Sequence, residues 1–137
     1  MTSATVLSGA RIVDPSRGMD ATGTVIIRDG RIAAAGPEAL NQGVPEGATV
    51  IDCAGKTVIP GLVDGRVFVG EPGGEHRETI ASASQAAAAG GITSIVTMPD
   101  TDPVIDDVAL VEFVLRTARD TASVHVYPAA AVTKGLA

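Results

Sequence analysis

Imidazole and thiol side chains, the usual nitrogen and sulfur ligands of zinc, are rare in this sequence. His76 and His125 are the only imidazoles, and Cys53 is the only thiol. His76 lies in a Glu-His-Arg-Glu loop, and His125 alternates with Val124 and Val126, which is typical of a strand residue that packs or meets solvent. A single cysteine excludes an intramolecular disulfide and a cysteine-built zinc site, so we expect Cys53 to be buried or half-buried.

Carboxylates are the other candidate ligands. An acidic run over residues 100–107 could offer oxygens to Ca²⁺, but it lacks the regular spacing and central glycine of a calcium loop. The run consists of Asp100, Asp102, Asp106 and Asp107.

The formal net charge of −6 argues against a nucleic-acid partner, because such binding needs clustered Lys and Arg.

No segment approaches the roughly 20 apolar residues of a membrane span, and residues 1–9 lack the pattern of a signal peptide. We therefore expect a cytoplasmic protein with no membrane partner.

The first part of the chain reads as strands separated by turns. Asp29-Gly30 between residues 25–28 and 31–35 is a strong hairpin signal, and residues 6–13 and 49–52 are further expected strands. We predict a small β-sandwich-like module over residues 1–59.

After Pro60-Gly61 the pattern alternates between strands and helices. We expect a helix over residues 78–89 that ends at Gly90-Gly91, and a second helix capped by Asp106. The three expected strands cover residues 62–69, 92–98 and 124–132. This order predicts right-handed crossovers in a parallel sheet.

The fold class is therefore α/β, with a small β-module followed by β/α units. An eight-stranded α/β barrel takes about 250 residues, and only roughly 75 follow Pro60. Residues 60–137 should thus form the first three strands and two helices of an incomplete barrel, as in a fragment of a longer protein.

Six segments carry a resemblance to a known family. They are residues 58–64 (VIPGLVD), 71–73 (EPG), 75–79 (EHRET), 86–93 (AAAAGGIT), 98–106 (MPDTDPVID) and 131–136 (AVTKGL). In order and spacing they resemble the N-terminal part of a bacterial dihydroorotase of the amidohydrolase superfamily, which implies a TIM-like barrel.

The resemblance also implies an active site that this chain lacks. In active dihydroorotases the first barrel strand ends in His-x-His, whose imidazoles bind zinc, and an Arg two residues later and a downstream Asn hold the substrate carboxylate. The two metal positions are Arg66 and Phe68 here, and the two substrate positions are Gly70 and Asp100.

Each replacement opposes the reaction. A guanidinium has no lone pair to donate, a phenyl ring has no ligand atom, and an aspartate repels a carboxylate. We expect no catalytic residue and no bound zinc. Phe68 should instead fill the emptied site as a buried plug, while Arg66 should pair with Asp64 or Glu71.

Three functions are open. The resemblance favours a non-catalytic dihydroorotase homologue that assembles with aspartate transcarbamoylase, with itself as a homo-oligomer, or with both. The alternative is a zinc-dependent amidohydrolase, acting on dihydroorotate or another cyclic amide, whose altered ligands are completed beyond Ala137. The third is a small-anion binding module built on Arg66.

Overall fold

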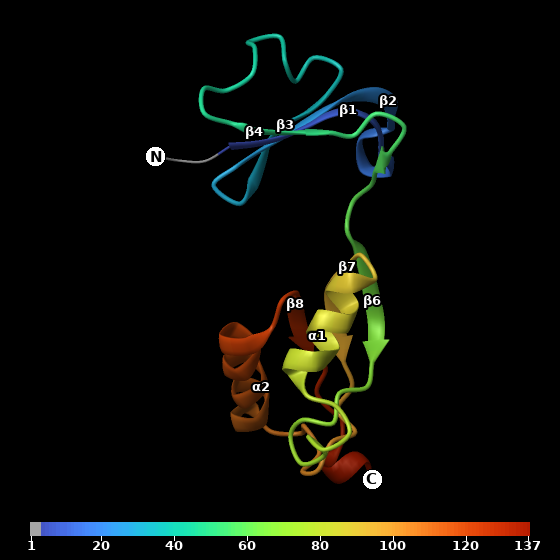
Figure 1. Cartoon of the computed structure of the whole chain (residues 1–137). Coiled ribbons are helices and arrows are strands. Elements are labelled where there is room, and N and C mark those ends of the chain that lie inside the picture. Colours follow the sequence, from blue (N-terminus) through green and yellow to red (C-terminus); the bar gives the residue numbers. More distant parts are fainter. Residues whose placement is uncertain (1–3) are drawn as a thin grey trace. The chain divides into compact units, whose positions relative to one another are not determined.

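This computed structural model describes residues 4–137, which separate after Pro60 into two compact units (Figure 1). The N-terminal unit contains strands, and the C-terminal unit alternates strands with helices. None of the helices in the described range is long and apolar enough to cross a membrane.

The N-terminal unit is built on two long paired strands. β2 is antiparallel to β1 and to β3, whereas β4 and β5 both run parallel to β1. The elements are β1 (Ala4–Asp14), the 3-10 turn η1 (Pro15–Arg17), β2 (Met19–Arg28), β3 (Arg31–Gly36), β4 (Thr49–Asp52) and β5 (Thr57–Val58).

These strands form one five-stranded sheet in the described residues, not the two stacked sheets of the expected sandwich-like module. The physical reason is that both short strands, β4 and β5, pair with β1 itself. They extend the existing sheet and do not start a second layer. Buried side chains include Val6, Ile26 and Cys53, so the expected burial of the cysteine is confirmed.

The predicted hairpin is present between β2 and β3. Asp29 and Gly30 have φ angles of 54° and 69°, as a two-residue turn with positive φ at both positions requires. Glycine adopts this conformation without a steric penalty, and aspartate tolerates it better than most residues. The local signal in the sequence was sufficient here.

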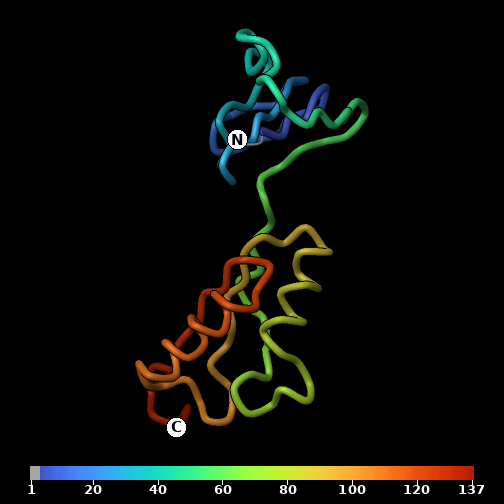
Figure 2. Tube along the Cα trace, turned by 60° about the vertical axis from the view of Figure 1, so that its left-hand side comes forward, coloured from blue at the N-terminus to red at the C-terminus, as the bar shows by residue number. Residues whose placement is uncertain are grey.

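The C-terminal unit has three parallel strands in the order β6-β7-β8. The chain alternates between strand and helix, which can be followed along the trace in Figure 2. Its elements are β6 (Leu62–Val67), α1 (Ile80–Ala89), β7 (Ile92–Thr97), α2 (Val108–Thr121), β8 (His125–Pro128) and the 3-10 turn η2 (Lys134–Leu136). The predicted α/β class is confirmed.

The two helices pack against the sheet through one apolar cluster. Ile80 and Val114 from the helices meet Ile95 and Val126 from β7 and β8, together with Ile105 from the loop before α2. Each of these side chains is buried. The same cluster fixes the distance between the helices and the strand ends, where the candidate site lies.

The helix starts differ from the sequence prediction by one or two residues. α1 begins at Ile80 because Thr79 caps it, with reciprocal hydrogen bonds between Thr79 and Ser82. α2 is capped by Asp107, whose carboxylate accepts from the Ala109 N–H at 2.8 Å. The prediction of Asp106 as the cap was wrong.

The ends of the predicted elements are correct in one case and too long in another. α1 ends at Ala89, and Gly91 follows it with a φ of 79°, as expected for a glycine beyond a helix C-terminus. β8 ends at Pro128, whereas the sequence predicted a strand to residue 132. The Ala129 N–H still donates to the carbonyl of Thr97, the last residue of β7, at 2.9 Å, but the Ala131 N–H donates to the Ile105 carbonyl at 2.8 Å and so leaves the sheet.

One buried hydroxyl joins α1 to the start of β8. Ser84 Oγ donates to the Ala81 carbonyl at 2.8 Å and accepts from the Ser123 N–H at 3.0 Å. Ser84→Ala should therefore lower the free energy of unfolding by about 1–3 kcal/mol, because the Ser123 N–H loses its partner. Urea denaturation measures this loss, with Gln85→Ala on the exposed side of α1 as the control. Equal effects of the two substitutions would contradict the role of Ser84.

Candidate functional site

The four positions singled out in the sequence lie at or just beyond the carboxyl ends of β6 and β7. Arg66 is near the end of β6, Phe68 and Gly70 open the loop to α1, and Asp100 lies in the loop after β7. In parallel α/β folds this edge of the sheet carries the functional loops. The topology therefore brings the predicted positions to one end of the C-terminal unit.

The end of β6 contains an irregularity. Asp64 pairs with Ile95 and Val67 pairs with Thr97, so β6 advances by three residues over a stretch in which β7 advances by two. The Asp64 carboxylate accepts from the Arg66 N–H at 3.0 Å within this bulge. Bulges of this kind bend a strand and redirect its side chains.

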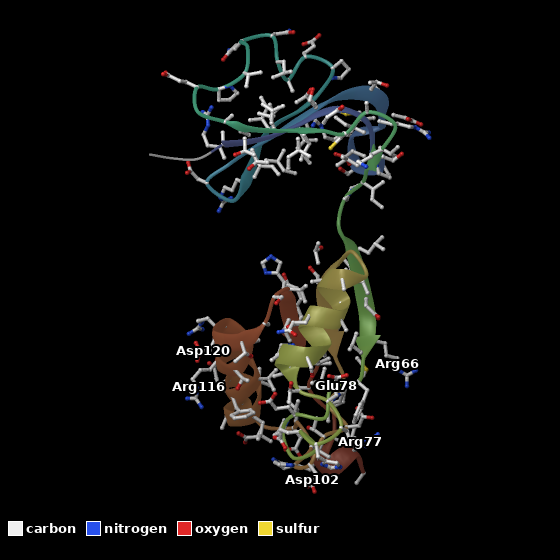
Figure 3. All side chains as sticks on the ribbon, in the orientation of Figure 1. Arg66, Arg77, Glu78, Asp102, Arg116 and Asp120 are labelled. Carbon is white, nitrogen blue, oxygen red and sulfur yellow. The ribbon has the colours of Figure 1, made fainter. Side chains whose placement is uncertain are left out.

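Arg66 lies exposed, and its side chain points away from the ribbon (Figure 3). Neither of the two ion pairs within residues 4–137 involves it. The expected partners are engaged elsewhere, because Asp64 accepts from a backbone N–H and Glu71 accepts from the Ile80 N–H at 2.9 Å. The predicted pairing of Arg66 with Asp64 or Glu71 was wrong.

Phe68 is not the buried plug that we expected. The residue is 40% exposed, while Val69 beside it is buried in the core formed with the helices. The face of the sheet opposite the helices is open within the described C-terminal unit, where Val63 and Tyr127 are exposed too. A ring on this face has no second layer to be buried against.

Arg77 is the neighbour that sequence reasoning missed. Its guanidinium carbon lies over the Phe68 ring, 4.7 Å from the centroid, in the geometry of a cation–π contact. Both residues belong to the loop between β6 and α1. No periodicity in the sequence predicts this contact, because it depends on how the loop folds back. The sequence shows only that an arginine is present in the segment of residues 75–79 (EHRET).

Gly70 stands at the closure of that loop. The Gly74 N–H donates to the Gly70 carbonyl, and Gly70 is buried. A Cβ at position 70 would overlap the Gly74 carbonyl oxygen and lie 3.0 Å from the Glu78 carbonyl oxygen. The backbone here leaves no room for a side chain, so an arginine could not occupy this position without a change in the loop.

These residues surround a shallow hollow of about 230 Å³. Phe68, Gly70 and Asp100 line it, whereas Arg66 does not. Figure 3 shows Arg77 and Asp102, two further lining residues, at this end of the C-terminal unit. The structure thus brings three of the four predicted positions together and adds a permanent cation to them.

The hollow does not fit zinc. Within residues 4–137 no three His, Cys, Asp or Glu side chains are grouped so that they could hold a metal ion. His76 lines the hollow, but His125 begins β8 and so lies toward the opposite end of the parallel strands. Zinc sites in proteins use at least three nitrogen, sulfur or oxygen ligands. The side chains that line the hollow in residues 4–137 do not form such a set.

A polar contact ties the last loop to the one before α2. Asp106 accepts from the Gly135 N–H at 2.7 Å and from Lys134 Nζ at 3.2 Å. The Gly135 hydrogen bond and then the Lys134 ammonium hold the pKa of the Asp106 carboxyl below its usual range. This long-range contact explains why the neighbouring Asp107, and not Asp106, caps α2.

The lowered pKa of Asp106 predicts a pH dependence. The contact should stabilise the folded state above the unfolded pKa of about 3.9, and this contribution should be lost as the pH falls through the lower folded pKa. In a pH titration followed by NMR, the Gly135 amide should shift with a midpoint below about 3.9. Asp106→Asn should abolish that step, and a midpoint at or above the usual value would contradict the assignment.

Comparison with known proteins gives consistent results. The family model described as "Dihydro-orotase-like" matches residues 55–136. A dihydroorotase from Citrifermentans bemidjiense is 43% identical over 132 residues, covering 95% of this chain and 30% of the relative. A dihydroorotase from Solibacter usitatus is 46% identical over 132 residues, covering 96% of this chain and again 30% of the relative.

Solved structures of two hydantoinases are similar to this chain in fold. The L-hydantoinase (dihydropyrimidinase) from Arthrobacter aurescens superposes with a TM-score of 0.79 at 26% identity, covering 96% of this chain and 28% of that protein. A D-hydantoinase superposes with a TM-score of 0.67 at 22% identity, covering 97% of this chain and 29% of that protein, which supports the fold alone. The chain spans about 30% of the length of the curated relatives described above.

Proposed function

Because the chain belongs to the dihydro-orotase-like family, we propose that it is a non-catalytic member whose role is structural. The chain keeps a barrel-type scaffold, while the four positions at the carboxyl ends of β6 and β7 differ from those that the resemblance implies for the active family.

The observation that carries the proposal is the Arg77 guanidinium over the Phe68 ring, at 4.7 Å from its centroid. Phe68 stands at the second metal-ligand position that the resemblance implies. A permanent cation next to that position repels a divalent metal ion, and the ring supplies no lone pair. To bind zinc, the site would need a ligand atom in place of the Phe68 ring and an uncharged side chain in place of Arg77.

The substrate positions point the same way. An arginine that holds a carboxylate needs a side chain at position 70, and the backbone there excludes even a Cβ. Asp100 is exposed on the rim of the same hollow, where its charge opposes an anionic substrate. Loss of metal binding and loss of carboxylate binding are therefore independent arguments for inactivity.

The partner proposed for this structural role is aspartate transcarbamoylase, alone or with further copies of this protein. Its support is the family resemblance together with the changed site. Sedimentation velocity of the two purified proteins, alone and mixed, tests it. A heavier species only in the mixture is the expected result, and unchanged profiles at micromolar concentrations would refute the partnership.

Metal analysis tests inactivity directly. The protein is purified without chelators, its zinc content is measured, and ring opening of dihydroorotate is followed by absorbance. We expect zinc well below one per chain and turnover at background. About one zinc per chain, or turnover well above background, would favour the zinc-dependent amidohydrolase with altered ligands.

A further inference from the structure

A second cavity in the C-terminal unit lies away from the candidate site. It measures about 730 Å³ and opens between the last turns of α1 and α2 and the first residues of β7 and β8. The candidate site lies at the other end of these parallel strands, beyond their carboxyl ends. Pockets that hold small organic ligands have volumes of about 300–1,000 Å³, so the cavity is of suitable size.

One side of the cavity comes from a stripe of α2. Leu115, Ala118 and Arg119 line it from neighbouring turns of α2, and Ala122, the residue after the helix, lines it too. Apolar side chains make up most of this stripe, and Arg119 adds a guanidinium in the last turn of the helix. Ile92 and Val124 continue the apolar lining from the sheet side.

Arg119 is the permanently charged side chain among the described residues that line the cavity, and no carboxylate lies beside it there. Arg119, His125, Thr93 and Ser123 line it, and no aspartate or glutamate is among its lining residues in the described chain. This composition stands out in a sequence with 16 acidic and 10 basic residues. A cationic ligand would find no counter-charge there, whereas an anion would.

Arg119 is available to a ligand. Its side chain is exposed, and neither of the ion pairs found within residues 4–137 includes it. Guanidinium groups bind carboxylate, sulfonate and phosphate oxygens through paired hydrogen bonds. We propose that this cavity binds a small organic anion with an apolar body, its acidic group held by Arg119 and its body packed on Leu115, Ile92 and Val124.

The neighbouring Arg116 provides a matched control. It lies on α2 outside the stripe and is not among the residues that line the cavity. Figure 3 shows Arg116 and Asp120 on the outer side of the helix. Neutralising either arginine changes the net charge equally, so only a local role of Arg119 can separate the two variants.

Two fluorescent probes with related aromatic rings test the proposal on the full chain. Anilinonaphthalene sulfonate carries an acidic group, and phenylnaphthylamine is its neutral counterpart. We expect saturable binding of the sulfonate at one site, weakened about tenfold by Arg119→Gln, as loss of a charge-assisted hydrogen bond implies. Arg116→Gln should stay within about threefold of the parent. Arg119→Lys should bind more weakly than the parent but more tightly than Arg119→Gln, because lysine keeps the charge and loses the paired hydrogen bonds. The neutral probe should respond to none of these substitutions.

Mapping the bound probe by amide chemical shifts completes the test. Changes centred on residues 91–93 and 122–126 are expected. Equal weakening by Arg116→Gln and Arg119→Gln, or shifts centred on the open sheet face around Val63 and Tyr127, would overturn the proposal. Circular dichroism of each variant verifies that the fold is kept, so a change in affinity can be assigned to the side chain.

Discussion

Replacing both Arg66 and Phe68 with histidine should leave ring opening of dihydroorotate at the rate of the unsubstituted protein. The double variant would place two imidazoles at the metal positions, but the substrate carboxylate would still meet Gly70 and Asp100. Two missing charge-assisted contacts, at about 1.5–3 kcal/mol each, correspond to roughly two to four orders of magnitude in rate. Arg77 would also remain in the loop as a competing cation.

The measurement is the absorbance change of dihydroorotate in zinc-containing buffer, with an active dihydroorotase as the reference. Adding Asp100→Asn to the double variant removes the repelling carboxylate and serves as a second arm. We expect that variant to stay far below the reference, because position 70 still has no side chain. A rate near that of the reference in either variant would show that the substrate positions are misassigned.

Local chemistry was enough to predict some elements and not others. The hairpin at Asp29-Gly30 and the glycine after α1 follow from backbone preferences of the residues themselves. The choice between Asp106 and Asp107 as a helix cap does not, because both are good capping residues. It is decided by Gly135, 29 residues along the chain, which donates to Asp106 and leaves Asp107 to cap the helix.

In the candidate site, too, some features follow from the local sequence and others depend on the tertiary structure. That Arg66 and Phe68 share one face, while Val67 and Val69 pack into the core on the other, follows from strand alternation, which the sequence contains. The burial of Phe68 depends on what covers the far face of the sheet, which is a property of tertiary structure. The contact with Arg77 depends on the path of a whole loop, and no pattern of spacing encodes it.

Gly70 is a position at which the interpretation from the sequence and the role seen in the structure differ widely. In the sequence it reads as the loss of an arginine. In the structure it is a position at which the Gly74 carbonyl oxygen occupies the space of a side chain. The same residue therefore has two meanings, a missing substrate contact and a required turn, and only the second can be measured without any substrate.

Gly70→Ala should accordingly destabilise the C-terminal unit strongly. The added methyl would overlap the Gly74 carbonyl oxygen, and both atoms belong to the loop that the Gly74 N–H closes onto Gly70. Neither can move as a flexible side chain would, so the loop must reopen. We expect a loss of about 3 kcal/mol in the free energy of unfolding, measured by urea denaturation.

Gly65→Ala is the matched control, because it adds the same methyl to a glycine five residues earlier. Nothing among the described atoms lies within 4 Å of a Cβ at Gly65, and its φ is not positive. Its effect should stay within about 0.5 kcal/mol. Equal stability of the two variants would mean that the loop tolerates a side chain at position 70. In that case an arginine could be restored there, and the structural argument against carboxylate binding would fail, whereas the argument from zinc ligands would stand.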